Sequence, residues 1–222
     1  RCPSPVLYFS LFQLPVDAGL MITASHNGPE YNGIKICLGK ESIWGNDIQE
    51  IKELFYKRSA IVATTTGSYK EHDVVSDYIM WLKKQFPHLV NMPLSAVVDC
   101  GNGADGYVLP ALMQTMEWQH VELLYADVDG TYPHHEADPT VEKNMLAVKE
   151  VLTSTAMPIG LGFDGDCDRM VPMTKNGQLV PGDKLLAIFA QDILQQHPGA
   201  SIVFDIKCSS ALQELINTWG GN

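Results

Sequence analysis

The chain has few positive charges and no paired cysteines. Its 15 lysines and arginines stand against 26 aspartates and glutamates, which gives a formal net charge of −11. We therefore expect neither a nucleic-acid backbone nor an anionic membrane as a partner. The five cysteines are scattered, and no two have the spacing of a CxxC pair. This pattern argues against a disulfide framework or a zinc site, and it favours a reducing, cytoplasmic compartment.

Long apolar runs are also missing. No stretch is long enough to cross a bilayer, and we expect no signal peptide. The sequence begins at Arg1, not at a methionine, and it ends directly after a helical pattern. We therefore expect a portion of a longer protein, truncated at both ends. What is present amounts to 222 residues, of which 45% are hydrophobic. That is enough for one large domain or two modest ones.

The first third of the chain predicts two strands around a polar turn, and then two helices. Residues 20–23 and 34–38 are apolar runs that predict buried strands. A helix is expected to begin at Asn46, where Gln49 would complete a capping box. A second helix is expected over about 74–85, because the segment is amphipathic and a proline follows at position 87.

A repeating order of strand, loop and helix follows. Strands are predicted at 96–99, 121–125 and 159–163, and the helices between them at 107–116 and 140–152. This alternation is typical of an α/β fold, in which a mostly parallel sheet is sandwiched by helices. Ligands of such sheets bind beyond the carboxyl ends of the strands. A further unit is predicted from a helix after Asp183, a strand at 201–205 and a helix at 209–218.

Three aspartates at alternate positions are the strongest local signal. Asp164, Asp166 and Asp168 follow the predicted strand at 159–163. Three anions crowded together cost free energy unless a cation offsets their charge, and oxygen ligands suit Mg²⁺ or Ca²⁺. Gly165 is expected to let the loop bend so that the carboxylates converge. The alternative is a solvated acidic turn.

Two other metal motifs fit the same stretch poorly. An EF-hand needs glycine at its sixth position and an acid at its twelfth, where this chain has Arg169 and Lys175. A phosphatase loop of the haloacid-dehalogenase type has threonine or valine where Asp168 stands, and it follows the first strand of its sheet. Three carboxylates leave Mg²⁺ short of protein ligands, so a phosphate held elsewhere in the fold could complete its shell.

A serine at the mouth of a strand could carry that phosphate. Residues 23–29 read TASHNGP, which places Ser25 between an apolar run and a group of turn formers. Hydroxyl nucleophiles are often presented on such loops, although the local pattern alone favours an ordinary polar turn. A phosphorylated Ser25 would supply an oxygen to the metal, and Arg169 could pair with the phosphate.

Seven motifs, in this order, resemble those of the α-D-phosphohexomutases, and within them the bacterial phosphomannomutase/phosphoglucomutase group. They are TASHN at 23–27, NGIK at 32–35, DCGNG at 99–103, DPT at 138–140 with Asn144, GFDGDCDR at 162–169, PGDKLL at 181–186 and FDIKC at 204–208. The resemblance covers nearly the whole chain. One departure stands out, because the family has proline where this chain has Gly28.

The resemblance implies a fold of four domains around a cleft. The chain would hold the last part of the first domain (1–73), the second (74–179) and the start of the third (180–222). Each implied site residue follows from a matching motif. Ser25 would be the phosphoserine, and its phosphate would hold Mg²⁺ together with Asp164, Asp166 and Asp168. His26 and Lys35 would act as acid, base or charge stabiliser. Arg169 would bind phosphate or substrate, and Lys207 would reach into the cleft.

The implied reaction is phosphoryl transfer between the 1- and 6-positions of a hexose phosphate of mannose or glucose. It would pass through phosphoserine and a hexose 1,6-bisphosphate, which is both intermediate and activator. A phosphoglucosamine mutase would share these motifs. A non-catalytic metal-binding fragment is a third hypothesis, because the family's sugar-recognition loop and fourth domain are absent from the sequence. His134 and His135 are predicted to lie in a solvated turn, not in a metal site.

Overall fold

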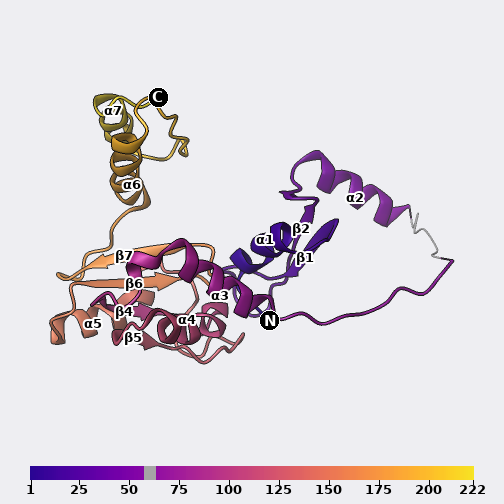
Figure 1. Cartoon of the computed structure of the whole chain (residues 1–222), viewed down its shortest axis with the longest axis horizontal. Coiled ribbons are helices and arrows are strands. Elements are labelled where there is room, and N and C mark those ends of the chain that lie inside the picture. The colour runs from indigo at the N-terminus through magenta and orange to yellow at the C-terminus, as the bar shows by residue number, and fades with distance from the viewer. Residues whose placement is uncertain (58–63) are drawn as a thin grey trace.

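The described part of the chain consists of three regions: two sheets, each with its own helices, and a pair of helices at the end of the chain. The structure is a computed structural model, and it describes residues 1–57 and 64–222 (Figure 1). The first region consists of α1 (Ser4–Gln13), β1 (Ala18–Ile22), β2 (Ile34–Leu38), β3 (Glu41–Ser42) and α2 (Asn46–Tyr56). Its three strands pair antiparallel in the order β1-β2-β3.

One face of this small sheet is covered and the other is open. Helix α1 packs Leu7 and Leu11 against Cys37 of β2, and all three are buried. The strands alternate, so the opposite face carries Leu20 and Ile22, which are 68% and 75% exposed. The prediction of a strand here is therefore confirmed, but the prediction that it is buried is wrong.

Helix α2 begins where the sequence predicts, but it is capped differently. Gly45 is the N-cap, with a φ of 56°, and no side chain caps the helix. Asn46 is already the first helical residue, so the predicted capping box with Gln49 does not form. The apolar face of α2 is exposed in this structure, including Leu54 and Phe55. Figure 1 shows α2 extending beyond the small sheet.

The second region is a four-stranded α/β sandwich. Its strands are β4 (Ser95–Asp99), β5 (His120–Leu124), β6 (Ile159–Phe163) and β7 (Met170–Thr174), in the order β5-β4-β6-β7. The first three of that order run parallel, and β7 runs antiparallel to β6. The helices are α3 (Val74–Gln85), η1 (Pro87–Leu89), η2 (Ala104–Tyr107), α4 (Leu109–Met116), η3 (Glu142–Met145) and α5 (Leu146–Ser154). The predicted fold class, a mixed and mostly parallel sheet between helices, is confirmed.

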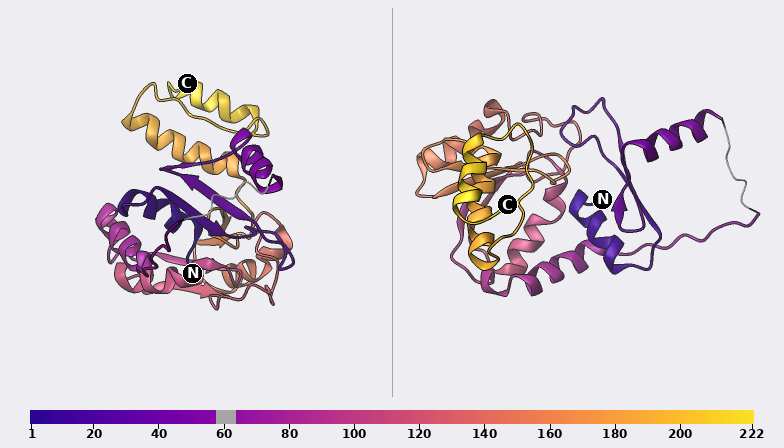
Figure 2. Two further views of the ribbon diagram at one scale, coloured as in Figure 1. Left: turned by 90° about the vertical axis from the view of Figure 1, so that its right-hand side faces the viewer. Right: turned by 90° about the horizontal axis from the view of Figure 1, so that it is seen from above.

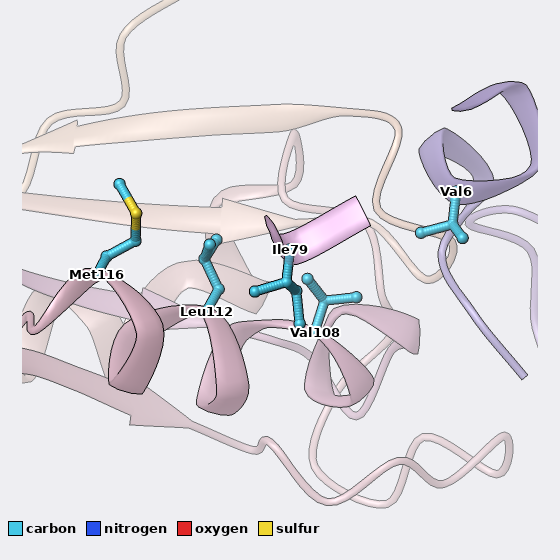
Figure 3. Close-up of a cluster of buried hydrophobic side chains, with 5 residues drawn as sticks. All are labelled: Val6, Ile79, Val108, Leu112 and Met116. Carbon is cyan, nitrogen blue, oxygen red and sulfur yellow. The ribbon is translucent and has the colours of Figure 1, made fainter. Parts of the chain in front are cut away.

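Buried side chains fill both faces of this sheet. On one face, Val148 and Leu152 of α5 pack on Val97. On the other face, α3 and α4 form a cluster of buried residues that also receives Val6 of α1 (Figure 3). Phe9 of α1 stacks edge-on against Tyr78 of α3 at a centroid distance of 5.3 Å. Helix α1 therefore packs against both regions and joins them, as the views in Figure 2 show.

The third region consists of α6 (Gly182–Gln196) and α7 (Ser210–Thr218). Buried leucine, isoleucine and alanine side chains hold the two helices together. Residues 201–205 form no strand, so that prediction is wrong: Val203 is 92% exposed and no neighbouring strand pairs with this segment among the described residues. Figure 1 shows α6 and α7 standing away from the four-stranded sheet. Among the described residues, no helix combines the length and apolar character needed to cross a membrane.

Candidate active site

The serine loop leaves β1 through a tight polar turn. The N–H of Ser25 donates to Thr23 Oγ1 at 2.8 Å, and the N–H of Asn27 donates to the carbonyl of Ala24 at 3.1 Å. Ser25 has a φ of 56°, a left-handed conformation that is uncommon for a residue with a side chain. Strained positions of this kind concentrate at functional sites. The turn thus aims the Ser25 hydroxyl away from the sheet, toward the second region.

The aspartate loop, residues 164–169, is the connection between β6 and β7. Phe163 and Met170 face each other in the register of the two strands, so the loop lies at the carboxyl end of β6. The left-handed residue in it is Cys167, with a φ of 59°, and not Gly165. Gly165 is needed for a different reason: a Cβ there would lie 2.5 Å from the carbonyl oxygen of Ser25. The expected bend at Gly165 is therefore replaced by a close approach of the two loops.

Ser25 and the aspartate loop meet directly. The Ser25 hydroxyl donates to Asp164 Oδ2 at 3.2 Å, and Arg169 Nη2 donates to Ser25 Oγ at 2.8 Å. The same guanidinium holds Asp164 Oδ2 through Nε at 2.9 Å and Nη2 at 2.6 Å. Arg169 Nη2 also contacts His26 Nδ1. One arginine thus links the serine, the histidine and the first aspartate.

Lys35 binds the other two carboxylates of the loop. Its Nζ lies 2.7 Å from Asp166 Oδ2 and 2.5 Å from Asp168 Oδ2. One ligand oxygen of each of the three aspartates lies within 4.8 Å of the others. Lys35 reaches them from β2, next to the turn that carries Ser25. The predicted residues Ser25, His26 and Lys35 are thus brought to the aspartates by the contact of two regions.

The pKa values of the two buried aspartates, Asp164 and Asp166, are shifted in opposite directions. Burial raises the pKa of Asp164, and its hydrogen bonds with Arg169 only partly offset this. Burial also acts to raise the pKa of Asp166, but hydrogen bonds from Lys35, Ser4 and Thr23 outweigh it, so that pKa is lowered. For Lys35, burial acts to lower the pKa, and the bonds to Asp166 and Asp168 raise it. Lys35 and Asp166 therefore form a stable ion pair near neutral pH.

The donor set fits a hard divalent cation. Three carboxylates converge, and Asp166 Oδ1 is buried without a hydrogen-bond partner among the described residues. A buried carboxylate oxygen without a partner costs free energy, and a metal ion would satisfy it. Oxygen ligands of this kind suit Mg²⁺ or Ca²⁺ more than a soft metal.

Lys207 is the predicted site residue that the structure does not bring to this cluster. It lies between α6 and α7, and its side chain is 85% exposed. Its Nζ is 3.8 Å from the carboxylate of Asp205, in the same loop. Its role in the cleft stays a prediction.

Several residues around the site were not foreseen from the sequence. Ser4 and Thr23 donate hydroxyl bonds to Asp166, at 2.8 Å and 3.1 Å. Burial acts to raise the pKa of Asp138, but hydrogen bonds from Thr140, with smaller contributions from His26 and Arg169, outweigh burial and lower that pKa. Serines and threonines in turns carry no signal for such long-range contacts, so no local pattern could have found Ser4.

The two adjacent histidines differ in exposure: His134 is exposed in a bend, whereas His135 is partly buried. His135 Nε2 lies 3.1 Å from Oδ2 of the buried Asp99, and its own side chain is 16% exposed. His134 Nδ1 lies 2.7 Å from Asn102 Oδ1, and its ring stacks on Tyr125 at a centroid distance of 4.0 Å. The prediction of a solvated turn therefore holds for His134 but is wrong for His135, whose ring contacts the buried Asp99 at the end of β4.

Comparison with known proteins decides the family. Residues 1–61 match the model described as phosphoglucomutase/phosphomannomutase, alpha/beta/alpha domain I, and residues 76–177 match the model of domain II. Together these matches cover more than half of the chain. The chain belongs to the phosphoglucomutase/phosphomannomutase family. The predicted resemblance is confirmed on this point.

Relatives of this family match the chain over nearly its whole length. It is 36% identical to a phosphomannomutase/phosphoglucomutase of Pseudomonas aeruginosa over 219 residues, which are 99% of the chain and 46% of that protein. It is 37% identical to a phosphoglucomutase of Neisseria meningitidis serogroup B, over 98% of the chain and 47% of that protein. The chain thus spans about half the length of the curated relatives it matches.

A solved structure gives the same result for the fold. The crystal structure of a phosphoglucomutase/phosphomannomutase family protein of Burkholderia thailandensis superposes with a TM-score of 0.89 at 34% identity. The match covers 100% of this chain and 49% of that one. Both the sequence and the arrangement of elements therefore follow the family.

Proposed function

We propose that this chain carries the phosphoryl-transfer centre of a phosphohexomutase. One observation supports this most strongly: Ser25 Oγ lies between Asp164 Oδ2 and Arg169 Nη2, at 3.2 Å and 2.8 Å, although Ser25 and Asp164 are 139 residues apart in the sequence. An ordinary polar turn would face solvent and would not be expected to contact both an acidic loop and a guanidinium group. Ser25 would carry the phosphoryl group in the resting enzyme.

Mg²⁺ fits the site, with Asp164, Asp166, Asp168 and a phosphate oxygen on Ser25 as its ligands. When bound, it would offset the negative charge of the transferring group. Arg169 donates to Ser25 Oγ, so it would stabilise the charge that develops on this oxygen when the phosphoryl group leaves. The raised pKa of Lys35 favours the ammonium form, which suits a charge stabiliser more than a proton donor.

The reaction we propose exchanges one phosphoryl group at a time. The bond between phosphorus and Ser25 Oγ breaks, and a bond forms between phosphorus and a free hydroxyl of a hexose monophosphate. The proton of that hydroxyl passes to a base, and Ser25 Oγ regains a proton. The resulting hexose 1,6-bisphosphate reorients, and its other phosphoryl group returns to Ser25. His26 would take part in the proton transfers, because its Nδ1 contacts the same Arg169 nitrogen that donates to Ser25 Oγ.

The substrates we propose are phosphates of glucose and mannose. The names of the relatives support these two sugars. Phosphoglucosamine mutase activity is the alternative within the same chemistry, and assays with the three sugar phosphates would separate them. We also propose that the enzyme is cytoplasmic, that the domains divide near residues 73 and 179, and that Lys207 serves the cleft from the third.

Intact-mass measurement tests the proposal on the chain itself. The chain is incubated with glucose 1,6-bisphosphate and Mg²⁺, and its mass is compared with that of a Ser25→Ala variant. We expect one phosphoryl adduct on the wild type and none on the variant, with Ser10→Ala as a matched serine control that keeps the adduct. If the wild type gains no adduct, the chain is a non-catalytic metal-binding fragment and the proposal is wrong for it.

A further inference from the structure

The two oxygens of Asp166 have very different surroundings. Oδ2 receives three donors: Lys35 Nζ at 2.7 Å, Ser4 Oγ at 2.8 Å and Thr23 Oγ1 at 3.1 Å. Oδ1 is buried and receives none among the described residues. A carboxylate can turn about its Cβ–Cγ bond with a broad, two-fold preference, so its rotamer alone does not fix which oxygen faces the metal site. The three donors to Oδ2 therefore decide which oxygen of Asp166 faces the metal site.

Ser4 is the most fixed of these three donors. It is fully buried, in the first turn of α1, whereas Lys35 and Thr23 are partly exposed. Its backbone N–H donates to the carbonyl oxygen of Asp166 at 2.8 Å, while its hydroxyl holds the carboxylate of the same residue. Ser4 thus holds both the backbone and the side chain of Asp166, from a position 162 residues away in the sequence.

The hydroxyl of Ser4 also connects Asp166 to Lys35. Lys35 Nζ donates to Ser4 Oγ at 2.9 Å. The single hydroxyl proton of Ser4 has two possible acceptors, Asp166 Oδ2 at 2.8 Å and Met21 Sδ at 3.2 Å. The carboxylate is the stronger acceptor because it is charged, and a thioether sulfur accepts only weakly. The proton therefore points to Asp166, and the ammonium completes a closed set of three groups.

We propose that Ser4 is a positioning residue of the metal site: its hydroxyl keeps Oδ2 of Asp166 turned toward Lys35, so that Oδ1 is presented to the cation. This inference rests on the proposed function, in which the aspartate loop binds Mg²⁺. Groups that orient a metal ligand through a hydrogen bond typically change metal affinity by about 10- to 100-fold when removed. Ser4 contacts no reacting atom in the proposed reaction, so its effect would pass through Asp166 and Lys35, the two groups that its hydroxyl contacts.

Manganese binding tests this role without an activity assay. Mn²⁺ serves as a paramagnetic probe for the Mg²⁺ site, and the free ion is measured by electron paramagnetic resonance during titration of the 222-residue chain. We expect Ser4→Ala to weaken Mn²⁺ binding by about 10-fold or more. Ser10→Ala is the matched control, because Ser10 lies in the same helix and its hydroxyl donates only to the backbone carbonyl of Leu7. Its Mn²⁺ affinity should equal that of the wild type.

A conservative variant separates positioning from simple support of the fold. Ser4→Thr keeps the hydroxyl and should recover most of the lost affinity. If Ser4→Ala lowers the melting temperature of the metal-free chain but leaves the Mn²⁺ affinity unchanged, Ser4 is only structural and the inference is wrong. Should Ser4→Ala fail to fold, Thr23→Val removes another donor from the same oxygen at a less buried position, and unchanged affinity in that variant would also overturn the inference.

The outcomes also distinguish this inference from the proposed function. If the wild-type chain does not bind Mn²⁺ at all, the metal site itself is wrong, and the role of Ser4 is wrong with it. If the wild type binds Mn²⁺ and Ser4→Ala binds it equally well, only the role of Ser4 is overturned.

Discussion

The two regions that meet at the candidate active site differ in how complete their hydrophobic cores are. The aspartate loop follows β6 of a sheet that helices cover on both faces, with side chains such as Val97, Val148 and Leu152 at most 1% exposed. The serine loop follows β1 of a sheet with one open face, where Leu20 is 68% exposed. One region therefore has a core of its own, while the other depends on contacts with its neighbour.

The difference shows what holds the site together. The apolar link between the regions is α1, and the polar links are the site contacts themselves, through Lys35, Arg169 and Ser4. Hydrogen bonds to charged groups at buried positions are worth about 1.5–3 kcal/mol each. The contacts of the candidate site thus also hold the less complete region against the more complete one.

A matched pair of leucine substitutions gives the largest expected effect. Leu152→Ala removes a fully buried side chain of α5, so the free energy of unfolding should fall by about 2–5 kcal/mol. Leu20→Ala, on the open face of the small sheet, should change it by less than about 0.5 kcal/mol. Urea unfolding of both variants measures the contrast. Similar losses in the two variants would mean that the open face is packed in solution.

Removing Lys35 should give a smaller loss that magnesium reverses. Lys35→Met leaves Asp166 and Asp168 without their ammonium partner, so the metal-free chain should lose about 1.5–3 kcal/mol of unfolding free energy. Added Mg²⁺ offsets the same negative charge and should restore more stability to the variant than it adds to the wild type. Thermal unfolding with and without MgCl₂ measures this, and Lys52→Met on the exposed face of α2 is the control. A loss that Mg²⁺ leaves untouched would contradict the account.

The smallest expected effect is a pH dependence from the second region alone. The pKa of His135 is raised: burial acts to lower it, but hydrogen bonds to Asp99 and to the carbonyl of Glu136 outweigh burial. Because the folded pKa exceeds the unfolded value, this stabilisation is fully present below the ordinary histidine pKa of about 6.5. It is lost as the pH rises through the raised value.

We expect His135→Gln to flatten this part of the stability profile, by about 1 kcal/mol for one hydrogen-bonded pair. The measurement is the free energy of unfolding as a function of pH. It runs in steps of about half a pH unit, from about one unit below the ordinary histidine pKa of about 6.5 to well above it. His88→Gln, which changes an exposed histidine of η1, should leave the profile unaltered. A variant that follows the wild-type curve would show that the pair with Asp99 adds nothing.

How far the sequence predicted the structure differs between regions for physical reasons. Helix α3 was predicted with its observed bounds, because Asp73 caps it and Pro87 follows its end. Strand β7 was missed because Pro172 interrupts its pattern, and an edge strand can tolerate a proline that a central strand cannot. Residues 201–205 have a strand-like composition, but no strand in the described part of the chain pairs with them. Strand propensity takes effect only in the context of a sheet.

The candidate site could be predicted where its chemistry leaves a local sequence pattern. Alternate aspartates after a buried strand indicate a cation site by their spacing, and the resemblance then pointed to Ser25. Ser4 and His135 leave no such pattern, because each acts through a contact with a residue far away in the sequence. Gly28, where the family has proline, is not explained by the fold: its φ lies outside the left-handed region, and a Cβ there would meet only the flexible carboxylate of Glu30.

The central claim is that the two regions build one divalent-cation site at Ser25. Isothermal titration calorimetry of Mg²⁺ into the 222-residue chain tests it most directly, with Asp166→Asn as the variant, because Asp166 Oδ1 is buried and has no hydrogen-bond partner among the described residues. We expect saturable Mg²⁺ binding to the wild type and a strong loss of affinity in the variant. Equal affinity for Mg²⁺ in the two proteins would contradict it.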